Sequence, residues 1–257
     1  MVRTSVWAHR GASGYAPENT LPSFKIAIEM KADGIELDIQ KTKDGRLVVI
    51  HDEDVYRVSG KKGLVKDYSY VDLSELNVCN RFPEYGKVSI PTLEEVYSLI
   101  KGTELIINAE LKNSKIFYEN LEEDIMLLAK KMGLEDRIIY TSFNHYSIVK
   151  MKKMDPSIKT GFLYEDGYIN MPKYAEKHGV EALHPAFYNL QYANFIKGCK
   201  KRGIEIRPWT INDPKDMKKL CKQGINTIIT NYPDICRKVV DDYEASKSYT
   251  NSTNKSV

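Results

Sequence analysis

Cysteine is scarce in this 257-residue chain, and its four copies show no pairing pattern. Neither a CxxC pair nor any other metal-ligand spacing joins Cys79, Cys199, Cys221 and Cys236. Isolated cysteines of this kind are typical of free, mostly buried thiols in a reducing compartment. We therefore expect a cytoplasmic protein, and we do not expect a thiol-based metal centre.

Long hydrophobic runs are also missing from the sequence. No apolar stretch approaches the roughly 18 residues that a membrane-spanning helix needs. A signal peptide is not expected either, because the candidate site residue His9 lies where such a peptide would have to be. We expect no stable insertion into a membrane.

A strong excess of charge of one sign is the third absence. The chain has 38 basic and 35 acidic residues, a net charge of +3. Nucleic-acid binding usually needs a clustered basic face. The lysine-rich runs at 150–153 and 197–202 fall in helix-like segments, where such runs are typical of solvated surface. We expect a small-molecule partner, no nucleic acid, and a monomer or homodimer.

The sequence does contain a regular alternation of apolar, strand-like runs with helical patterns. Helices are expected from Thr20, from Thr92 with a capping box to Glu95, and in five later segments. Eight such strands separated by helices predict a parallel TIM (β/α)8 barrel, with a doubly wound open sheet as the alternative. The expected strands are 5–8, 34–41, 104–111, 138–141, 159–163, 181–183, 203–207 and 226–230.

Two regions interrupt this alternation. Asp44-Gly45 between two apolar runs indicates a hairpin directly after the second strand. Residues 53–89 are polar and poorly periodic, and we interpret them as a small inserted subdomain above the barrel. We expect one catalytic domain over residues 1–242 and a polar, disordered tail over residues 243–257.

Carboxylates lie on one face of the second strand. Glu36 and Asp38 are two residues apart, so strand periodicity places both on the same side. For an isolated strand, a solvated outer face explains them. In a parallel barrel, helices cover the outside, so these acids must point inward toward the mouth. Unpaired carboxylates are costly to bury there, and a divalent cation would stabilise them.

The strand at 104–111 repeats this arrangement with Asn108, Glu110 and Lys112 on one face. Glu110 is a candidate third carboxylate of the same site, and Lys112 is placed to contact a bound anion. A structural salt bridge between Glu110 and Lys112 is the alternative.

The hairpin predicts where His51 lies. If Asp44 and Gly45 are the two turn residues, pairing partners sum to 89 and Asp38 faces His51 across the strands. Such partners share a face, with Cβ atoms about 4.5–5.5 Å apart. A three-residue turn with a bulge would shift this register by one residue.

A second histidine, His9, ends the short apolar run at 6–8 and precedes Arg10. Arginine binds oxyanions through two contacts, and histidine exchanges protons near neutral pH. Two histidines, Arg10, Lys112 and three carboxylates at one mouth are the set that phosphoryl chemistry needs.

These residues resemble the glycerophosphodiester phosphodiesterase family from His9 to about Asp234. Five motifs carry the resemblance: His9-Arg10-Gly11 with Pro17-Glu18-Asn19-Thr20; residues 34–40 with Lys43-Asp44-Gly45 and His51-Asp52; Glu110-Leu111-Lys112; Pro208-Trp209-Thr210-Ile211-Asn212; and Thr230-Asn231-Tyr232-Pro233-Asp234.

The resemblance implies a TIM barrel with an insertion after the second strand and hydrolysis of glycerophosphodiesters such as glycerophosphocholine and glycerophosphoethanolamine. The products are sn-glycerol 3-phosphate and an alcohol. By resemblance, Glu36, Asp38 and Glu110 bind Ca²⁺ or Mg²⁺, His9 and His51 are the general acid and base, Arg10 and Lys112 contact the phosphate, and Trp209 with Phe143 walls the glycerol pocket.

Other activities on a similar barrel stay open at this point. A phosphoinositide-type phospholipase C, a lysophospholipase D and a non-catalytic phosphodiester-binding barrel are the alternatives. An acyl chain would need an apolar surface, for which the insertion offers Tyr68, Tyr70, Leu73 and Leu76.

The chain departs from the family pattern in three places. Pro208 precedes the tryptophan, Asn231 stands where aspartate is frequent, and the insertion reads 55–60 without the usual Arg-Thr-Thr-like run. These differences leave the identity of the alcohol open. We expect a structural role for His184, which ends another strand.

Overall fold

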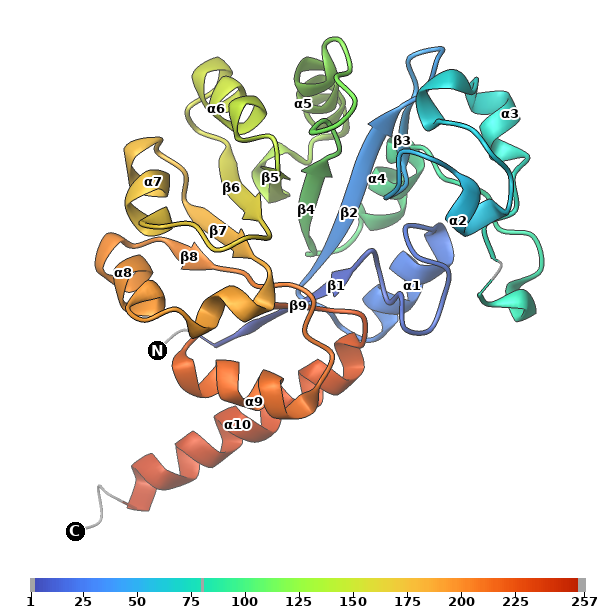
Figure 1. Cartoon of the computed structure of the whole chain (residues 1–257). Coiled ribbons are helices and arrows are strands. Elements are labelled where there is room, and N and C mark those ends of the chain that lie inside the picture. The colour runs from blue at the N-terminus through green and yellow to red at the C-terminus, as the bar shows by residue number, and fades with distance from the viewer. Residues whose placement is uncertain (1–2, 80, 254–257) are drawn as a thin grey trace.

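The computed structural model describes residues 3–79 and 81–253, and its centre is a nearly closed barrel of eight parallel strands (Figure 1). The predicted TIM barrel is confirmed. The strands follow the order β8-β7-β6-β5-β4-β2-β1-β9. Backbone hydrogen bonds from Ile229 to Pro208 and from Ile211 to Ile229 connect the last two edges. The barrel strands are β1 (Ser5–His9), β2 (Gly34–Lys41), β4 (Ile106–Leu111), β5 (Ile138–Ser142), β6 (Lys159–Tyr164), β7 (Ala182–Pro185), β8 (Glu205–Ile206) and β9 (Thr227–Thr230).

Helices surround the barrel and cover the outer faces of its strands (Figure 1). The capping box predicted at Thr92 is present: its hydroxyl accepts from the Glu95 N–H at 3.1 Å, and the Glu95 carboxylate accepts from the Thr92 N–H at 2.7 Å. The outer helices are α1 (Leu21–Glu29), α4 (Leu93–Ile100), α5 (Leu121–Met132), α6 (His145–Met154), α7 (Met171–Lys177), α8 (Phe195–Arg202), α9 (Pro214–Gln223) and α10 (Pro233–Thr253).

The alternation along β2 separates the apolar core from the site. Ile35, Leu37 and Ile39 are fully buried in the main hydrophobic cluster, which the outer helices complete. The residues between them, Glu36 and Asp38, therefore point into the barrel, as the strand period requires. Both acids are buried there, so the barrel interior holds charge-bearing groups next to an apolar core.

The insertion folds beside the mouth of the barrel on a small core of its own. It contains α2 (Tyr56–Ser59), α3 (Tyr70–Ser74) and the 3₁₀ turns Val65–Asp67 and Pro83–Tyr85. Leu73 is fully buried in this core, and the half-buried Tyr68, Tyr70 and Leu76 pack against it. These side chains therefore contribute to packing within the insertion, and Tyr68, Tyr70 and Leu76 remain partly exposed.

The hairpin register predicted from Asp44-Gly45 is wrong by one residue. Short strand β3 (Leu47–Val49) pairs with β2 so that partner numbers sum to 88, as in Ile39 with Val49. The turn is the three-residue form, closed by a hydrogen bond from Thr42 N to Arg46 O, with Gly45 in the left-handed region at φ 81°. Asp38 therefore pairs with Ile50, whose N–H donates to its carbonyl at 3.0 Å.

The C-terminal segment also differs from the expectation of disorder. Helix α10 runs to Thr253, so residues 243–253 are helical in this structure. Residues 254–257 lie outside the described part of the chain.

Candidate active site

Three carboxylates meet on the neighbouring strands β2 and β4, on the side that faces the barrel interior. Strand pairing places Asp38 beside Glu110. One oxygen from each of Glu36, Asp38 and Glu110 lies within 4.8 Å of the others, and all three residues are buried. This is the cluster that the strand periodicity predicted.

Burial and mutual repulsion oppose ionisation in this cluster. Burial raises the pKa of Glu36, and the charges of Asp38 and Glu110 raise it further. Burial also raises the pKa of Glu110, while the nearby Lys112 ammonium opposes that shift. For Asp38, burial would raise the pKa, but the combined effect of His51, Arg10 and Lys112 lowers it. The nearby cations therefore do not offset the charge that all three acids would carry if they were ionised together. A bound cation would offset it, as expected for residues that bind a metal ion.

The loop after β1 supplies Arg10. Its backbone N–H donates to Glu36 at 3.0 Å, and its guanidinium lies 2.9 Å from Glu18 and 3.5 Å from Asp38. Asn19 completes this contact by donating from its amide to Asp38 at 2.8 Å. The Pro17–Thr20 motif thus supports the acid cluster as well as leading into helix α1.

His9 is the last residue of β1 and faces the acid cluster. Its Nδ1 donates to the Asn231 amide oxygen at 2.8 Å, which leaves Nε2 on the side of Glu36, 4.0 Å away. Burial lowers the pKa of His9 to about 4, and the adjacent Arg10 charge adds to this effect. Asn231, which stands where the family often has aspartate, is therefore the partner that orients His9.

His51 reaches the same pocket although it is not the strand partner of Asp38. Strand β3 ends at Val49, and the buried Gln40 holds the chain that follows. The Gln40 amide donates to the carbonyls of Ile50, His51 and Asp52 at 3.1, 3.1 and 2.7 Å. Gln40 is therefore a positioning residue for His51 that the periodicity argument missed.

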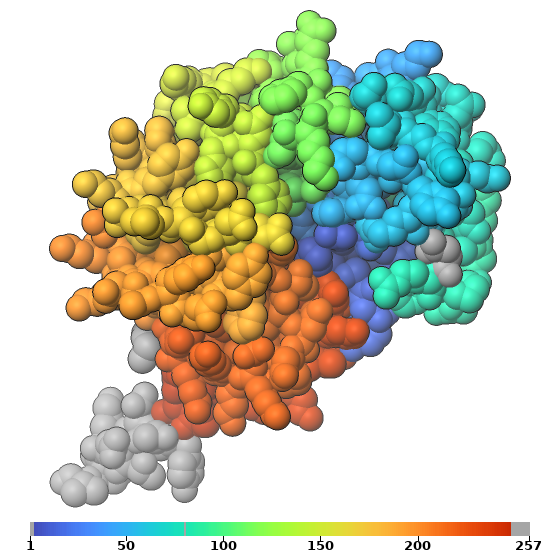
Figure 2. Space-filling model, viewed as in Figure 1, coloured from blue at the N-terminus to red at the C-terminus, as the bar shows by residue number. Residues whose placement is uncertain are grey.

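A chain of ion pairs joins the two histidine-bearing loops. His51 Nδ1 lies 2.6 Å from Asp52, and Asp52 pairs with Arg57 of helix α2. Arg57 in turn makes two hydrogen bonds of 2.7 and 2.8 Å to Glu18, the residue that holds Arg10. The insertion thereby fastens to the β1 loop, and Figure 2 shows the cyan insertion against the blue N-terminal segment.

Neither Glu18 nor Arg57 was a sequence candidate. Arg57 lies in the segment 55–60, which differs from the family pattern, and only the folded chain shows that it faces Glu18. Burial would raise the pKa of Glu18, but Arg57 and Arg10 outweigh burial and lower it.

The residues of the candidate active site surround a pocket of about 480 Å³ at the barrel mouth. Eight of the nine candidate residues line it, and Asp38 lies beneath as part of the acid cluster. Lys112 Nζ lies 2.9 Å from Glu110 and 6.0 Å from the centre of the Phe143 ring. Phe143 and Trp209 meet edge to face, with ring centres 5.8 Å apart. The pocket therefore joins cations at its base to an aromatic wall.

His184 stays outside the pocket, in keeping with the expected structural role. It is fully buried, and its Nε2 lies 3.3 Å from the Arg207 guanidinium. Its ring packs so close to Gly161 that a Cβ there would approach it to 2.6 Å. The carbonyl of His184 accepts from the Trp209 indole at 2.9 Å, so His184 supports the aromatic wall.

Comparison with known proteins agrees with this geometry. Residues 9–235 match the model of the glycerophosphoryl diester phosphodiesterase family. A glycerophosphodiester phosphodiesterase of Caldanaerobacter subterraneus subsp. tengcongensis is 42% identical over 234 residues, which cover 91% of this chain and 96% of the relative. This chain belongs to the glycerophosphodiester phosphodiesterase family. It is an enzyme with the activity of that family.

Solved structures of the family share the same barrel. A phosphodiesterase of Oleispira antarctica, solved in complex with the product sn-glycerol-3-phosphate, matches with a TM-score of 0.82 and 28% identity, covering 93% of this chain and 97% of that one. A glycerophosphodiester phosphodiesterase of Thermotoga maritima matches with a TM-score of 0.78 and 29% identity over 93% and 99%. Within the described residues of our chain, no helix is long and apolar enough to cross a membrane.

Proposed function

We propose that the enzyme hydrolyses glycerophosphodiesters such as glycerophosphocholine and glycerophosphoethanolamine to sn-glycerol 3-phosphate and an alcohol, with a divalent cation and His9 and His51 as the general acid and base. The observation that carries this proposal is the joining of both histidines, Arg10 and Lys112 to one buried acid cluster in one pocket. The product found in the Oleispira relative supports the same substrate class.

The acid cluster fits a hard divalent cation. Asp38 Oδ1 is buried and accepts no hydrogen bond among the described residues. The Lys112 ammonium stays 3.8 Å away from this oxygen. Glu36, Asp38 and Glu110 would hold Ca²⁺ or Mg²⁺, both of which prefer oxygen ligands. When bound, such a cation supplies positive charge that neutralises the phosphate and polarises it for attack.

Around this centre, the chain's own residues bind and orient the phosphodiester. Arg10 and Lys112 line the pocket and offset the charge that grows on phosphorus-bound oxygens. Both cations are held by carboxylates, Arg10 by Glu18 and Lys112 by Glu110, so they are in place before the substrate enters. Phe143 and Trp209 cover the apolar edge of the glycerol.

The two histidines exchange protons with the substrate. Each has its Nδ1 occupied, in His9 by Asn231 and in His51 by Asp52, so Nε2 is the nitrogen left for chemistry. One histidine takes the proton from the nucleophile, and the other donates a proton to the leaving alcohol oxygen. The nucleophile is either water, which gives sn-glycerol 3-phosphate directly, or a hydroxyl of the substrate's own glycerol, which gives a cyclic phosphate that water must then open.

Turnover of a panel of glycerophosphodiesters tests this proposal, with sn-glycerol 3-phosphate as the measured product. We expect chelation to stop turnover and added Mg²⁺ or Ca²⁺ to restore it, whereas Glu36→Ala stays inactive after metal addition. Full activity in excess chelator would contradict the metal site. Near-normal turnover by the His9→Ala, His51→Ala double variant would contradict the acid–base pair.

Location is a separate proposal. The four cysteines are free and buried, which supports the reducing, cytoplasmic compartment expected from the sequence. Fractionation of the native host cells, with an antibody to the enzyme, would test it.

A further inference from the structure

A second hollow opens from the catalytic pocket on the side away from the insertion. It has a volume of about 740 Å³ and is lined by residues that follow β4, β5 and β6. It shares Ser114, Phe143, Leu163 and Glu165 with the catalytic pocket, so the two spaces adjoin each other. We call this second hollow the annex. The mechanism proposed above leaves it unused.

The annex carries negative charge without a compensating cation. Glu165 and Asp166 are exposed at its wall, and neither carboxylate has a hydrogen bond or ion pair among the described residues. Among the residues that the structure describes around the annex, none is a lysine or an arginine. In the adjoining catalytic pocket, by contrast, Arg10, Lys112 and Lys115 all contribute to the lining.

Aromatic rings form much of the remaining wall. Phe143 is 36% exposed, Tyr168 57% and Tyr146 90%, values that are high for side chains of this size. Aromatic faces next to a carboxylate are the surroundings that bind ammonium and quaternary ammonium groups, through cation–π attraction and charge.

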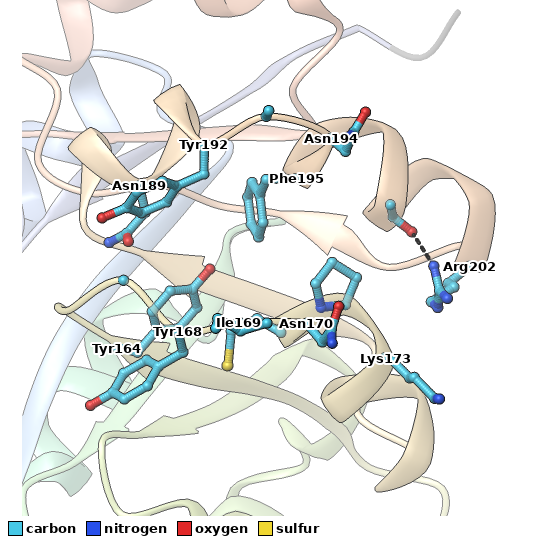
Figure 3. Close-up of a pocket in the computed structure, with 15 residues that line it drawn as sticks. Tyr164, Tyr168, Ile169, Asn170, Lys173, Asn189, Tyr192, Asn194, Phe195 and Arg202 are labelled. Atoms are coloured by element: carbon cyan, nitrogen blue, oxygen red, sulfur yellow. Dashed lines mark hydrogen bonds between the residues drawn. The ribbon is translucent and has the colours of Figure 1, made fainter.

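The next hollow along the same side has a different character. It measures about 540 Å³, lies between helices α7 and α8, and shares Tyr164 and Tyr168 with the annex. Figure 3 shows its basic side chains, Lys173 and Arg202, at the end away from those two tyrosines. The exposed carboxylates without partners therefore lie in the annex, and one of them, Glu165, also borders the catalytic pocket.

The charges along this surface match those along one kind of substrate. A phosphodiester of an amino alcohol carries a negative phosphate and, a few bonds away, a positive nitrogen. With the phosphate beside Arg10 and Lys112, a short alcohol chain that leaves the catalytic pocket at its shared border with the annex, between Ser114, Leu163 and Glu165, would bring that nitrogen to the annex. A neutral alcohol such as glycerol gains no charge attraction from Glu165 and Asp166.

We propose that the annex binds the cationic nitrogen of an amino-alcohol group, and that Glu165, Asp166 and Tyr168 make the enzyme prefer such glycerophosphodiesters to those with a neutral alcohol. The inference rests on the proposed function, because it assigns one end of that substrate. It is a specificity site, and it takes no part in bond cleavage.

The test compares glycerophosphocholine with glycerophosphoglycerol on the wild type and on a Glu165→Gln, Asp166→Asn double variant. We expect the wild type to prefer the choline ester. The variant should lose about 3- to 10-fold in kcat/KM for glycerophosphocholine, chiefly through KM, as expected for the loss of exposed charge contacts. Turnover of glycerophosphoglycerol should stay within about twofold, because that substrate places no charge in the annex.

A ring variant and a distant variant complete the design. Tyr168→Leu should also weaken the choline ester selectively, since it removes the π face and keeps an apolar side chain. Asp136→Asn, at the opposite end of the barrel before β5, removes one negative charge far from the annex and should alter turnover of neither substrate.

Each outcome decides between the two proposals. Two results would overturn the annex proposal and leave the proposed function standing. One is an equal loss of kcat/KM for both substrates in the double variant, and the other is an equal kcat/KM for both substrates in the wild type. Failure of the wild type to hydrolyse either diester with metal present overturns the proposed function and, with it, the annex proposal.

Discussion

The two sides of the barrel mouth are built differently. On the side of β1, β2 and the insertion, Arg10, Glu18, Asp52 and Arg57 form a continuous chain of ion pairs. On the side of β5 and β6, aromatic side chains stand exposed, and two carboxylates lack partners among the described residues. The first side fixes groups that must meet a phosphate within fractions of an ångström. Substitutions on the second side would leave the ion pairs of the first side in place.

Removing a histidine from the side of the mouth that carries the ion pairs should cause the largest loss of activity. His9→Ala and His51→Ala are each expected to lower kcat by about 10²–10⁴-fold, because each removes a group that moves a proton in the transition state. Steady-state kinetics on glycerophosphocholine would measure this. Unchanged circular dichroism and melting temperature would show that folding is intact, and a loss below about tenfold in either variant would contradict its assigned role.

Breaking the ion-pair chain should cost less. Arg57→Gln removes the cation that joins Asp52 to Glu18. Asp52, which contacts His51, and Glu18, which holds Arg10, would each lose an ion pair. We expect kcat to fall by about 10- to 100-fold with a smaller change in KM, as for a misplaced catalytic group. Arg57→Lys should recover part of the loss, because it keeps the charge but not the paired hydrogen bonds.

The matched control for Arg57 is Lys66→Gln, which removes a cation from an exposed ion pair elsewhere in the insertion. It should leave kcat unchanged. A purely structural role for Arg57 would lower stability without lowering the kcat of the folded fraction, and that result would contradict positioning.

The aromatic wall should respond more mildly still. Phe143→Leu keeps an apolar side chain but removes the ring that meets Trp209. We expect KM to rise by about 3- to 10-fold, the usual value of one aromatic contact, with kcat nearly constant. Saturation kinetics would measure both constants. A loss in kcat that exceeds the loss in KM would place Phe143 in the chemical step instead.

The smallest expected effect is on stability at low pH. The pKa of Glu18 is lowered in the folded state, where burial is outweighed by Arg57 and Arg10. The stabilisation is therefore present above the ordinary glutamate pKa and is lost as the pH falls through the lower folded value. At pH 7, Arg57→Gln should reduce the free energy of unfolding by about 1–2 kcal/mol.

That difference between wild type and Arg57→Gln should shrink as the pH falls from 5 to 3. In this range the unfolded chain takes up protons at Glu18 and Asp52, whereas the lowered pKa of both groups opposes protonation in the folded wild type. Urea unfolding at pH 7, 5, 4 and 3 would measure it. A difference that stays constant with pH would show that Arg57 stabilises the fold through packing of its aliphatic chain rather than through these ion pairs.

Short-range patterns in the sequence determined a large part of this protein. The two-residue period of β2 decides which side chains face the barrel interior, and that period alone is enough to place Glu36 and Asp38 together. The alternation of strands and helices predicted the barrel. These features depend on neighbours along the chain, so they can be read from the sequence.

The tertiary structure decided those features of the site that depend on the type of turn or on contacts between residues far apart in the sequence. A three-residue turn in place of a two-residue one moved Asp38 opposite Ile50, yet His51 still reaches the pocket because Gln40 holds its backbone. The pairing of Arg57 with Glu18 spans 39 residues, and the annex joins loops from three strands. No local period encodes such contacts, because they form only when the barrel brings the ends of its strands to one mouth.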